Sequence, residues 1–84
     1  MTRLLFFGRL RDVTGFAERD LELPRDIATI ADLRAFLSAS DPDLGEAIAA
    51  RGVRVAVNQS FCLNDLESVC DAREIAFMPP LSGG

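Results

Sequence analysis

Residues 74–84 read Glu-Ile-Ala-Phe-Met-Pro-Pro-Leu-Ser-Gly-Gly, and this stretch contains both a strand and its end. The first five residues are mostly apolar, which is typical of a buried strand. Pro79 and Pro80 have no backbone N–H to donate to a β-ladder and fix φ near about −65°, so the strand must end at Met78. The sequence therefore predicts a strand over residues 74–78 that passes directly into an extended segment.

The segment after this strand is expected to be a thin tail over residues 79–84, outside a single domain formed by residues 1–78. Gly83 and Gly84 place no side chain beyond Ser82. The tail can reach at most about 20 Å, at roughly 3.3 Å per residue. This shape suits a main-chain carboxylate that enters the narrow active site of another protein.

The rest of the chain predicts four more strands, two helices and one helical turn. Apolar runs and apolar–polar alternation predict strands over residues 2–7, 17–23, 53–57 and 60–63. The main helix begins at Thr29, and Asp32 three residues later completes a capping-box pattern. A second, short helix begins at Asp41 and Pro42, an N-cap residue followed by a first-turn proline. Residues 9–13 are expected to form the helical turn.

The order of these elements predicts an α+β fold of the β-grasp, ubiquitin-like class. The first and last strands are the most apolar, so both belong inside a mixed sheet, side by side. The main helix is expected to pack across one face of that sheet. Its apolar stripe consists of Ile30, Leu33, Phe36 and Leu37.

The other face of the sheet is expected to be apolar too, because side chains alternate between the two faces of a strand. This second set consists of Leu5, Phe7, Ala56, Ala76 and Met78, with Phe61 at its edge and Arg54 as an interrupting charge. An exposed apolar patch usually marks an interface. Loops or the second helix could instead cover it. We expect a docking surface for a partner beside the root of the tail.

Composition argues against several classes of function. The chain has 84 residues, a net charge of −4 and no run of the roughly 18 apolar residues that a membrane span needs. The acidic balance argues against nucleic acid, which requires a basic patch, and leaves room for a basic partner surface. We expect no membrane association and a cytoplasmic location.

The chain contains no His, Lys, Tyr or Trp. It therefore has no imidazole base or metal ligand, and no lysine for a Schiff base. Cys62 and Cys70 are not spaced as a CxxC motif and are expected to be ordinary thiols, with a disulfide between them left open. We expect no side-chain active site, no metal and no bound cofactor, which leaves the carboxylate of Gly84 as the reactive group.

Three segments resemble the small subunit of molybdopterin synthase, and the resemblance runs over essentially the whole chain. They are residues 5–11, residues 57–59 and residues 74–84, whose Pro-Pro-x-Ser-Gly-Gly ending is the most specific. The family implies a β-grasp sulfur carrier. An E1-like enzyme adenylates its terminal glycine with ATP, and a sulfur donor system converts the adenylate to a thiocarboxylate. The large synthase subunit then uses that sulfur to build the dithiolene of molybdopterin, in molybdenum cofactor biosynthesis.

The resemblance also implies roles for individual residues of this non-catalytic subunit of a heteromer. Gly84 would carry the sulfur, and Gly83 would let the tail thread. The partner contacts would come from Phe7, Arg11, Phe61, Met78, Pro79, Pro80, Leu81 and Ser82. Residues 70–73 depart from the Asp-Gly-Asp-like turn usual in relatives, and Met78 stands where an aromatic residue is common, a volume that Met can fill.

Three alternatives stay open. The first is a sulfur carrier for another pathway, such as thiazole synthesis, although those carriers are usually shorter and lack the Pro-Pro-x-Ser step. The second is a ubiquitin-like modifier joined to target lysines, for which the absence of Lys excludes only chains built on itself. The third is a plain β-grasp interaction module whose two glycines have no role.

Overall fold

The structure, a computed structural model, describes residues 1–80, so residues 81–84 lie outside the described part. The strands are β1 (Thr2–Phe6), β2 (Glu18–Leu21), β3 (Arg54–Val57), β4 (Ser60–Phe61) and β5 (Glu74–Met78). The helices are α1 (Arg9–Thr14), α2 (Ile30–Ser40) and α3 (Pro42–Ile48). The bounds of β5 are those predicted from the sequence, and the two prolines after it account for its end at Met78.

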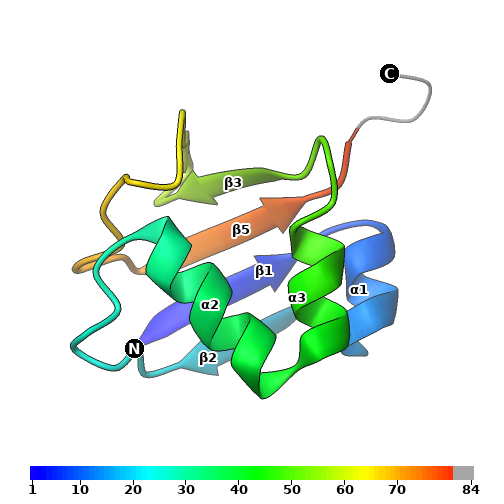
Figure 1. Cartoon of the computed structure of the whole chain (residues 1–84), viewed down its shortest axis with the longest axis horizontal. Helices are drawn as coiled ribbons and strands as arrows, with labels where there is room; N and C mark the ends of the chain where they lie inside the picture. The colour runs from blue at the N-terminus through cyan, green and yellow to red at the C-terminus, as the bar shows by residue number, and fades with distance from the viewer. Residues whose placement is uncertain (81–84) are drawn as a thin grey trace.

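The strands form one mixed sheet in the order β2-β1-β5-β3-β4. β1 and β5 pair in parallel, and all other neighbours in the sheet are antiparallel. The prediction that the first and last strands are neighbours inside the sheet is confirmed. Figure 1 shows α2 and α3 on one face of this sheet and α1 beside the end toward which β1 and β5 point.

The core lies between the sheet and the helices. Its buried side chains are Leu4, Phe6, Leu10, Ile30, Leu33, Leu37, Leu44, Ile48, Val55, Val69, Ala72, Ile75 and Phe77. The rings of Phe6 and Phe77, which are in register on β1 and β5, stack with centroids 5.6 Å apart and planes 8° from parallel. Burying one such side chain stabilises the fold by roughly 1.5–3 kcal/mol. Phe36 packs against this core but is only partly buried.

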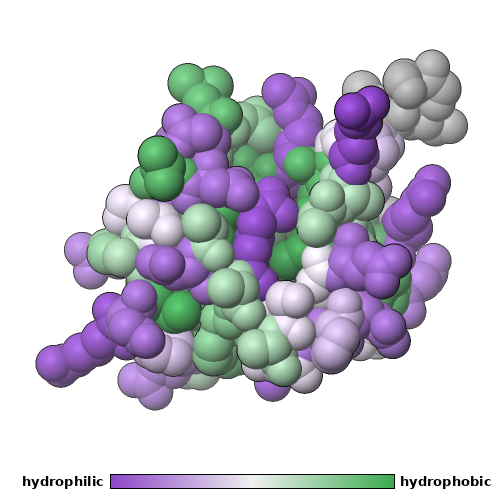
Figure 2. Space-filling model, viewed as in Figure 1, coloured by the Kyte–Doolittle hydropathy of each residue, from purple (hydrophilic) through white to green (hydrophobic). Residues whose placement is uncertain are grey.

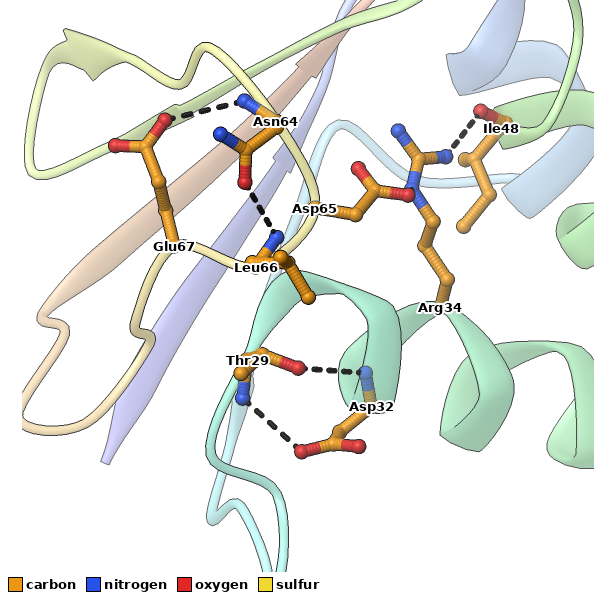
Figure 3. A network of polar contacts seen from close by, with 8 residues as sticks. All are labelled: Thr29, Asp32, Arg34, Ile48, Asn64, Asp65, Leu66 and Glu67. Atoms are coloured by element: carbon orange, nitrogen blue, oxygen red, sulfur yellow. Dashed lines mark hydrogen bonds and ion pairs between the residues drawn. The ribbon is translucent and has the colours of Figure 1, made fainter.

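Both α2 and α3 begin as the sequence predicts. Thr29 Oγ1 accepts a hydrogen bond from Asp32 N at 3.2 Å, and Asp32 Oδ2 accepts from Thr29 N at 3.1 Å (Figure 3). Asp32 Oδ2 also accepts from Ala28 N at 3.0 Å. Asp41 Oδ1 accepts from Leu44 N at 3.2 Å. These caps provide partners for N–H groups that the first turn of a helix otherwise leaves without one.

The four strands predicted before residue 74 are all longer than those of the structure, β2 and β4 by more than one residue. β4 ends at Phe61 rather than Leu63. The backbone N–H groups of the residues after Cys62 donate to the Glu67 carboxylate instead of continuing the pairing with β3. Glu67 Oε2 accepts hydrogen bonds from Leu63 N and from Asn64 N, the latter at 3.2 Å (Figure 3). The strand predicted over residues 17–23 is also shorter in the structure, because only four of its residues pair with β1.

Asn58 and Gln59 form the turn between β3 and β4. Asn58 and Gln59 have φ values of 49° and 70°, the left-handed backbone that two-residue hairpins with the native twist require. Asn58 Oδ1 then accepts hydrogen bonds from Arg73 N at 2.9 Å and Glu74 N at 3.2 Å, which fixes the start of β5. Asp71, in the segment that departs from the family's usual turn, has φ 61°, which Asp tolerates better than most residues.

Replacing Asp32 by Asn is expected to destabilise the fold at neutral pH but not in acid. The backbone N–H groups of Ala28 and Thr29 bond to the Asp32 carboxylate and lower its pKa below the ordinary value of 3.8. A carboxylate with a lowered folded-state pKa stabilises the fold above its unfolded pKa, and this contribution disappears as the pH falls through the folded pKa. Urea unfolding midpoints from pH 7 down to roughly pH 2.5 check this.

Asp43→Asn is the matched control for this change. Asp43 lies in the first turn of α3, so the variant removes the same charge from the same kind of position. Among residues 1–80, no backbone N–H donates a hydrogen bond to the Asp43 carboxylate, whereas two donate to that of Asp32. An equal loss from Asp43→Asn, or a loss from Asp32→Asn that persists unchanged in acid, contradicts the prediction.

Candidate functional site

The face of the sheet opposite α2 and α3, here called the open face, carries apolar side chains in rows across the strands. Leu5 on β1 is in register with Ala76 on β5, Ala76 with Ala56 on β3, and Ala56 with Phe61 on β4. A second row begins at Phe7, whose N donates to Phe77 O at 3.1 Å, which places Phe7 beside Met78. Met78 is in register with Arg54.

The short helix predicted from Asp41 is α3, and it does not cover the open face. It packs on the same face as α2 through the buried Leu44 and Ile48 (Figure 1). Phe7 is 42% exposed and Phe61 is 54% exposed, while Met78 is partly buried. Exposed aromatic rings on a sheet are a common anchor for a partner protein.

The smallest residues of the open face are buried. Ala56 and Ala76 lie in the middle of the first row, between the larger side chains of Leu5 and Phe61. The face is therefore low at its centre and has aromatic side chains toward its ends. Such relief favours a partner surface with a projecting apolar side chain over a flat one.

A cation lies at the edge of the open face. The guanidinium carbon of Arg54 is 4.9 Å from the centroid of the Phe61 ring, a cation–π geometry. Arg11, which the resemblance assigns to partner contact, is exposed on α1. Its side chain makes no ion pair or hydrogen bond with another residue of the described part. The structure brings Phe7, Met78 and Phe61 to one face and shows no contact between Arg11 and them.

The root of the tail lies at the end of the same face. Pro79 is partly buried and Pro80 is exposed. Two glycines that the sequence analysis did not connect with the tail, Gly8 and Gly52, lie against these prolines. No local pattern reveals such a contact, since the residues are far apart in the chain. Leu81, Ser82, Gly83 and Gly84, to which the sequence analysis assigns contact and chemistry, lie outside the described residues.

A cleft of about 890 Å³ lies between α1, α3 and the two prolines. Its lining is mostly small and aliphatic, with Arg9, Asp43 and Glu46 as the charged residues. No thiol lines it. Its two carboxylates, those of Asp43 and Glu46, both come from α3.

The two thiols are separate and free within residues 1–80, Cys62 partly buried and Cys70 exposed. Burial, together with the negative charge of Glu67, raises the pKa of the Cys62 thiol. A raised pKa lowers the fraction of nucleophilic thiolate at neutral pH. The described residues group no three Cys, Asp or Glu side chains that could hold a metal ion. Across residues 1–80, every helix is too short or too polar to span a bilayer.

Two leucines that the sequence analysis did not single out are almost fully exposed. Leu63 is 93% exposed and Leu66 is 80% exposed, on the connection between β4 and β5. Figure 2 shows isolated apolar side chains projecting from the molecule at this edge. Two contacts hold the connection in place. Leu66 N donates to Asn64 Oδ1 at 2.8 Å, and Asp65 pairs with Arg34 of α2 at 3.1 Å (Figure 3).

Comparison with known proteins gives matches over nearly the whole chain. The sequence model of the ThiS family matches residues 4–84. The molybdopterin synthase sulfur carrier subunit of Chlamydomonas reinhardtii is 36% identical over 83 residues, which are 98% of this chain and 96% of that protein. The subunit of the same name from Escherichia coli K12 is 31% identical over 84 residues, all of both chains. The one from Haemophilus influenzae is 35% identical over 85 residues, also at full coverage.

Solved structures share the fold. SAMP1 from Haloferax volcanii superposes with a TM-score of 0.76 at 22% identity, over 99% of this chain and 98% of that one. A putative molybdopterin converting factor subunit 1 from Pyrococcus furiosus has a TM-score of 0.76 at 24% identity, over 95% and 97%. At these identities the likeness shows the fold alone, and together with the strand order it confirms the predicted β-grasp class.

Proposed function

This chain belongs to the ThiS family, and on that premise we propose that it is the sulfur carrier subunit of a molybdopterin synthase, with Gly84 as the residue that carries the sulfur. The observation that carries the proposal is the extent of the match. Relatives with this name are similar over 98–100% of the chain. The family model reaches Gly84, so the matched region includes the Pro-Pro-x-Ser-Gly-Gly ending.

The chemistry proposed for Gly84 follows from the properties of a carboxylate. A terminal carboxyl group has a pKa of about 3.5, so it is ionised at neutral pH and is a poor electrophile. In the first step a carboxylate oxygen attacks the α-phosphorus of ATP, and pyrophosphate leaves. In the second step a donor that supplies sulfur at the oxidation level of hydrosulfide attacks the carbonyl carbon. The bond to the phosphate oxygen breaks, AMP leaves, and a thiocarboxylate remains.

The partners follow from this sequence of steps. A synthase sulfur carrier subunit works with a large catalytic subunit, which takes the sulfur. An E1-like adenylating enzyme and a sulfur donor system are further proposed partners, because an ionised carboxylate must be activated before sulfur can replace its oxygen. The open face, with Phe7 and Phe61 exposed, is the proposed docking surface for the large subunit. Because activation consumes ATP, we propose a cytoplasmic location.

The proposal is tested by intact-mass measurement after co-expression with an E1-like enzyme and a sulfur donor. The expected result is a mass increase equal to the difference between sulfur and oxygen, located at Gly84 by fragmentation. A large adduct on target proteins would instead indicate a modifier, and an unchanged mass would indicate an interaction module. Either of these two results overturns the proposed function. Molybdopterin formation on addition of the large subunit and the sulfur-free precursor then separates this pathway from thiazole synthesis.

Replacing Cys62 and Cys70 together by Ser is expected to leave sulfur loading close to the wild-type rate. The raised pKa of Cys62 keeps its thiol mostly protonated at neutral pH. Neither thiol lies in the cleft beside the root of the tail. The measurement is the rate of thiocarboxylate formation by mass spectrometry, with Ser60→Ala as a control for a surface hydroxyl change. Loss of loading in a folded double variant would move the chemistry from the carboxylate to a thiol.

A further inference from the structure

Gly8 makes an unusually close approach to the first proline of the tail. It follows β1, has φ +56° and leaves no room for a side chain. A Cβ placed on Gly8 would lie 2.8 Å from Pro79 Cγ and 3.6 Å from Pro79 Cδ. Such a carbon–carbon separation is well inside van der Waals contact. Glycine is therefore needed here for two reasons, the backbone conformation at φ 56° and ψ −134° and the nearby proline ring.

Gly52 makes the same kind of approach to the second proline. It precedes β3 and has φ +89°. A Cβ at Gly52 would lie 2.8 Å from Pro80 Cβ and 3.3 Å from Pro80 Cγ. The two contacts are independent, because Gly8 and Gly52 belong to different loops and each contacts a different proline.

The topology of the sheet explains why these two loops meet the tail. β5 lies between β1 and β3. β1 is parallel to β5, so the loop that leaves β1 starts at the end where β5 finishes. β3 is antiparallel to β5, so the loop that enters β3 arrives at that same end. Gly8 and Gly52 therefore flank the continuation of β5 from its two neighbouring strands.

Contact replaces hydrogen bonding at this point of the chain. Beyond Met78, neither Pro79 nor Pro80 has an N–H to donate, so the ladder cannot hold the chain. The fixed φ of each proline makes the segment stiff. Because the segment is stiff, the direction in which it leaves the domain depends on the positions of the Pro79 and Pro80 rings.

We propose that Gly8 and Gly52 are positioning residues that form a seat for Pro79 and Pro80 and so set the direction in which the chain leaves the domain. This inference rests on the proposed function, in which Gly84 must enter the active sites of partner proteins while the domain is docked outside. A bulkier residue at either glycine displaces a proline ring and redirects everything beyond it. The open face is left in place, so docking and delivery of the carboxylate become separable.

Among residues 1–80, one more glycine with a positive φ, Gly15, provides a control. Gly15 has φ +82°, similar to the others, but a Cβ added there would meet nothing within 4 Å. Gly15→Ala therefore carries the cost of a left-handed alanine without any contact with a proline. The difference between it and Gly52→Ala measures the effect of the seat. Gly8→Ala also carries the strain of a backbone at φ 56° and ψ −134°, which the Pro79→Ala background separates from the contact with the ring.

The experiment compares these three alanine variants in ATP-dependent thiocarboxylate formation, with sodium sulfide and the E1-like enzyme that loads the wild-type chain. We expect kcat to fall about 10- to 100-fold for Gly8→Ala and Gly52→Ala with little change in KM, since a misplacement of about 1 Å can cost that much. Gly15→Ala is expected to keep a wild-type kcat in its folded fraction. The inference is overturned if Gly15→Ala loses as much as the other two, or if KM alone changes.

A second measurement tests the seat without activity. In the NMR spectrum of the wild-type chain, the α-protons of Gly8 are expected to show nuclear Overhauser contacts with the ring protons of Pro79, and those of Gly52 with Pro80. Absence of both contacts in the folded wild type overturns the seat whatever the kinetics. If the contacts are present but the wild type is never loaded with sulfur, the proposed function fails and the geometry stands.

A double variant covers the case in which Gly8→Ala folds poorly. Pro79→Ala removes Cγ and Cδ, the two atoms nearest the added carbon, and leaves only Cβ at 4.0 Å. Gly8→Ala should therefore lower stability much less in the Pro79→Ala background than in the wild type, whereas Gly15→Ala should cost the same in both. Equal costs of Gly8→Ala in the two backgrounds would overturn the seat.

Discussion

Removing Gly84, or adding one alanine after it, is expected to abolish thiocarboxylate formation while the domain remains folded. In the deletion the terminal carboxylate belongs to Gly83, and the tail is one residue too short for the proposed active site of the E1-like enzyme. In the extension the terminal carboxylate belongs to an alanine, whose β-carbon lies next to the carbonyl that must react. The described sheet and its core lie within residues 1–80, so the domain is expected to keep its fold after either change. The measurement is intact mass after incubation with the E1-like enzyme, ATP and sulfide, with thermal unfolding as the check on the fold.

An alanine added before Met1 is the matched control, because it lengthens the chain equally at the other end. We expect this control to be loaded with sulfur like the wild type. Normal loading of a chain extended beyond Gly84, with the extension shown by mass to be still present, would rule out the terminal carboxylate as the sulfur acceptor.

Replacing Phe7 by Asp is expected to weaken binding of the large synthase subunit at least about 30-fold, which corresponds to the roughly 2 kcal/mol of an interface anchor. Phe7 is 42% exposed at the end of β1, beside Met78. A charge forced into that interface adds a desolvation penalty. The stability of the free domain should change far less, since substitutions at exposed positions usually stay within about 0.5 kcal/mol. Calorimetric titration and urea unfolding measure the two effects.

Leu66→Asp is the control for this second prediction. Leu66 is 80% exposed, and it lies on the β4–β5 connection rather than in the rows of the open face. The change introduces the same charge on an exposed apolar residue and should leave affinity unchanged. If Phe7→Asp unfolds the domain and affinity follows only the folded fraction, Phe7 belongs to the core and the docking surface lies elsewhere. Met78→Asp is a less clean test, because Met78 is partly buried.

Parts of the fold were predictable because they depend on residues that are close together in the sequence. The end of β5 at Met78 follows from the missing N–H of Pro79, and the start of α2 follows from the Thr29 side chain. Alternation on β1 and β5 also separates the buried Phe6 and Phe77 from Phe7, which the sequence places on the open face. Each of these depends on neighbours in the chain or on the pleat of one strand.

Features that depend on distant residues were not predictable in the same way. β4 stops early because Glu67 captures the backbone of Leu63 and Asn64, a competition that strand propensity does not contain. The contacts of Gly8 and Gly52 with the prolines arise from sheet order, since each glycine looks in sequence like an ordinary break. For the proposed site, the sequence identifies Gly84 by resemblance, and only the packing identifies what lies at the root of its tail.

The position of β5 has a consequence for biosynthesis. This strand is the last element of the domain to leave the ribosome, yet it lies between β1 and β3 and supplies the buried Ile75 and Phe77. Pairings between the two ends of a chain close late in folding, because they carry the largest loop entropy. A nascent or prematurely terminated chain without β5 cannot complete its sheet and is open to degradation. Every molecule that passes this folding step has therefore already been translated through β5, so chains that end before this strand do not present a completed open face.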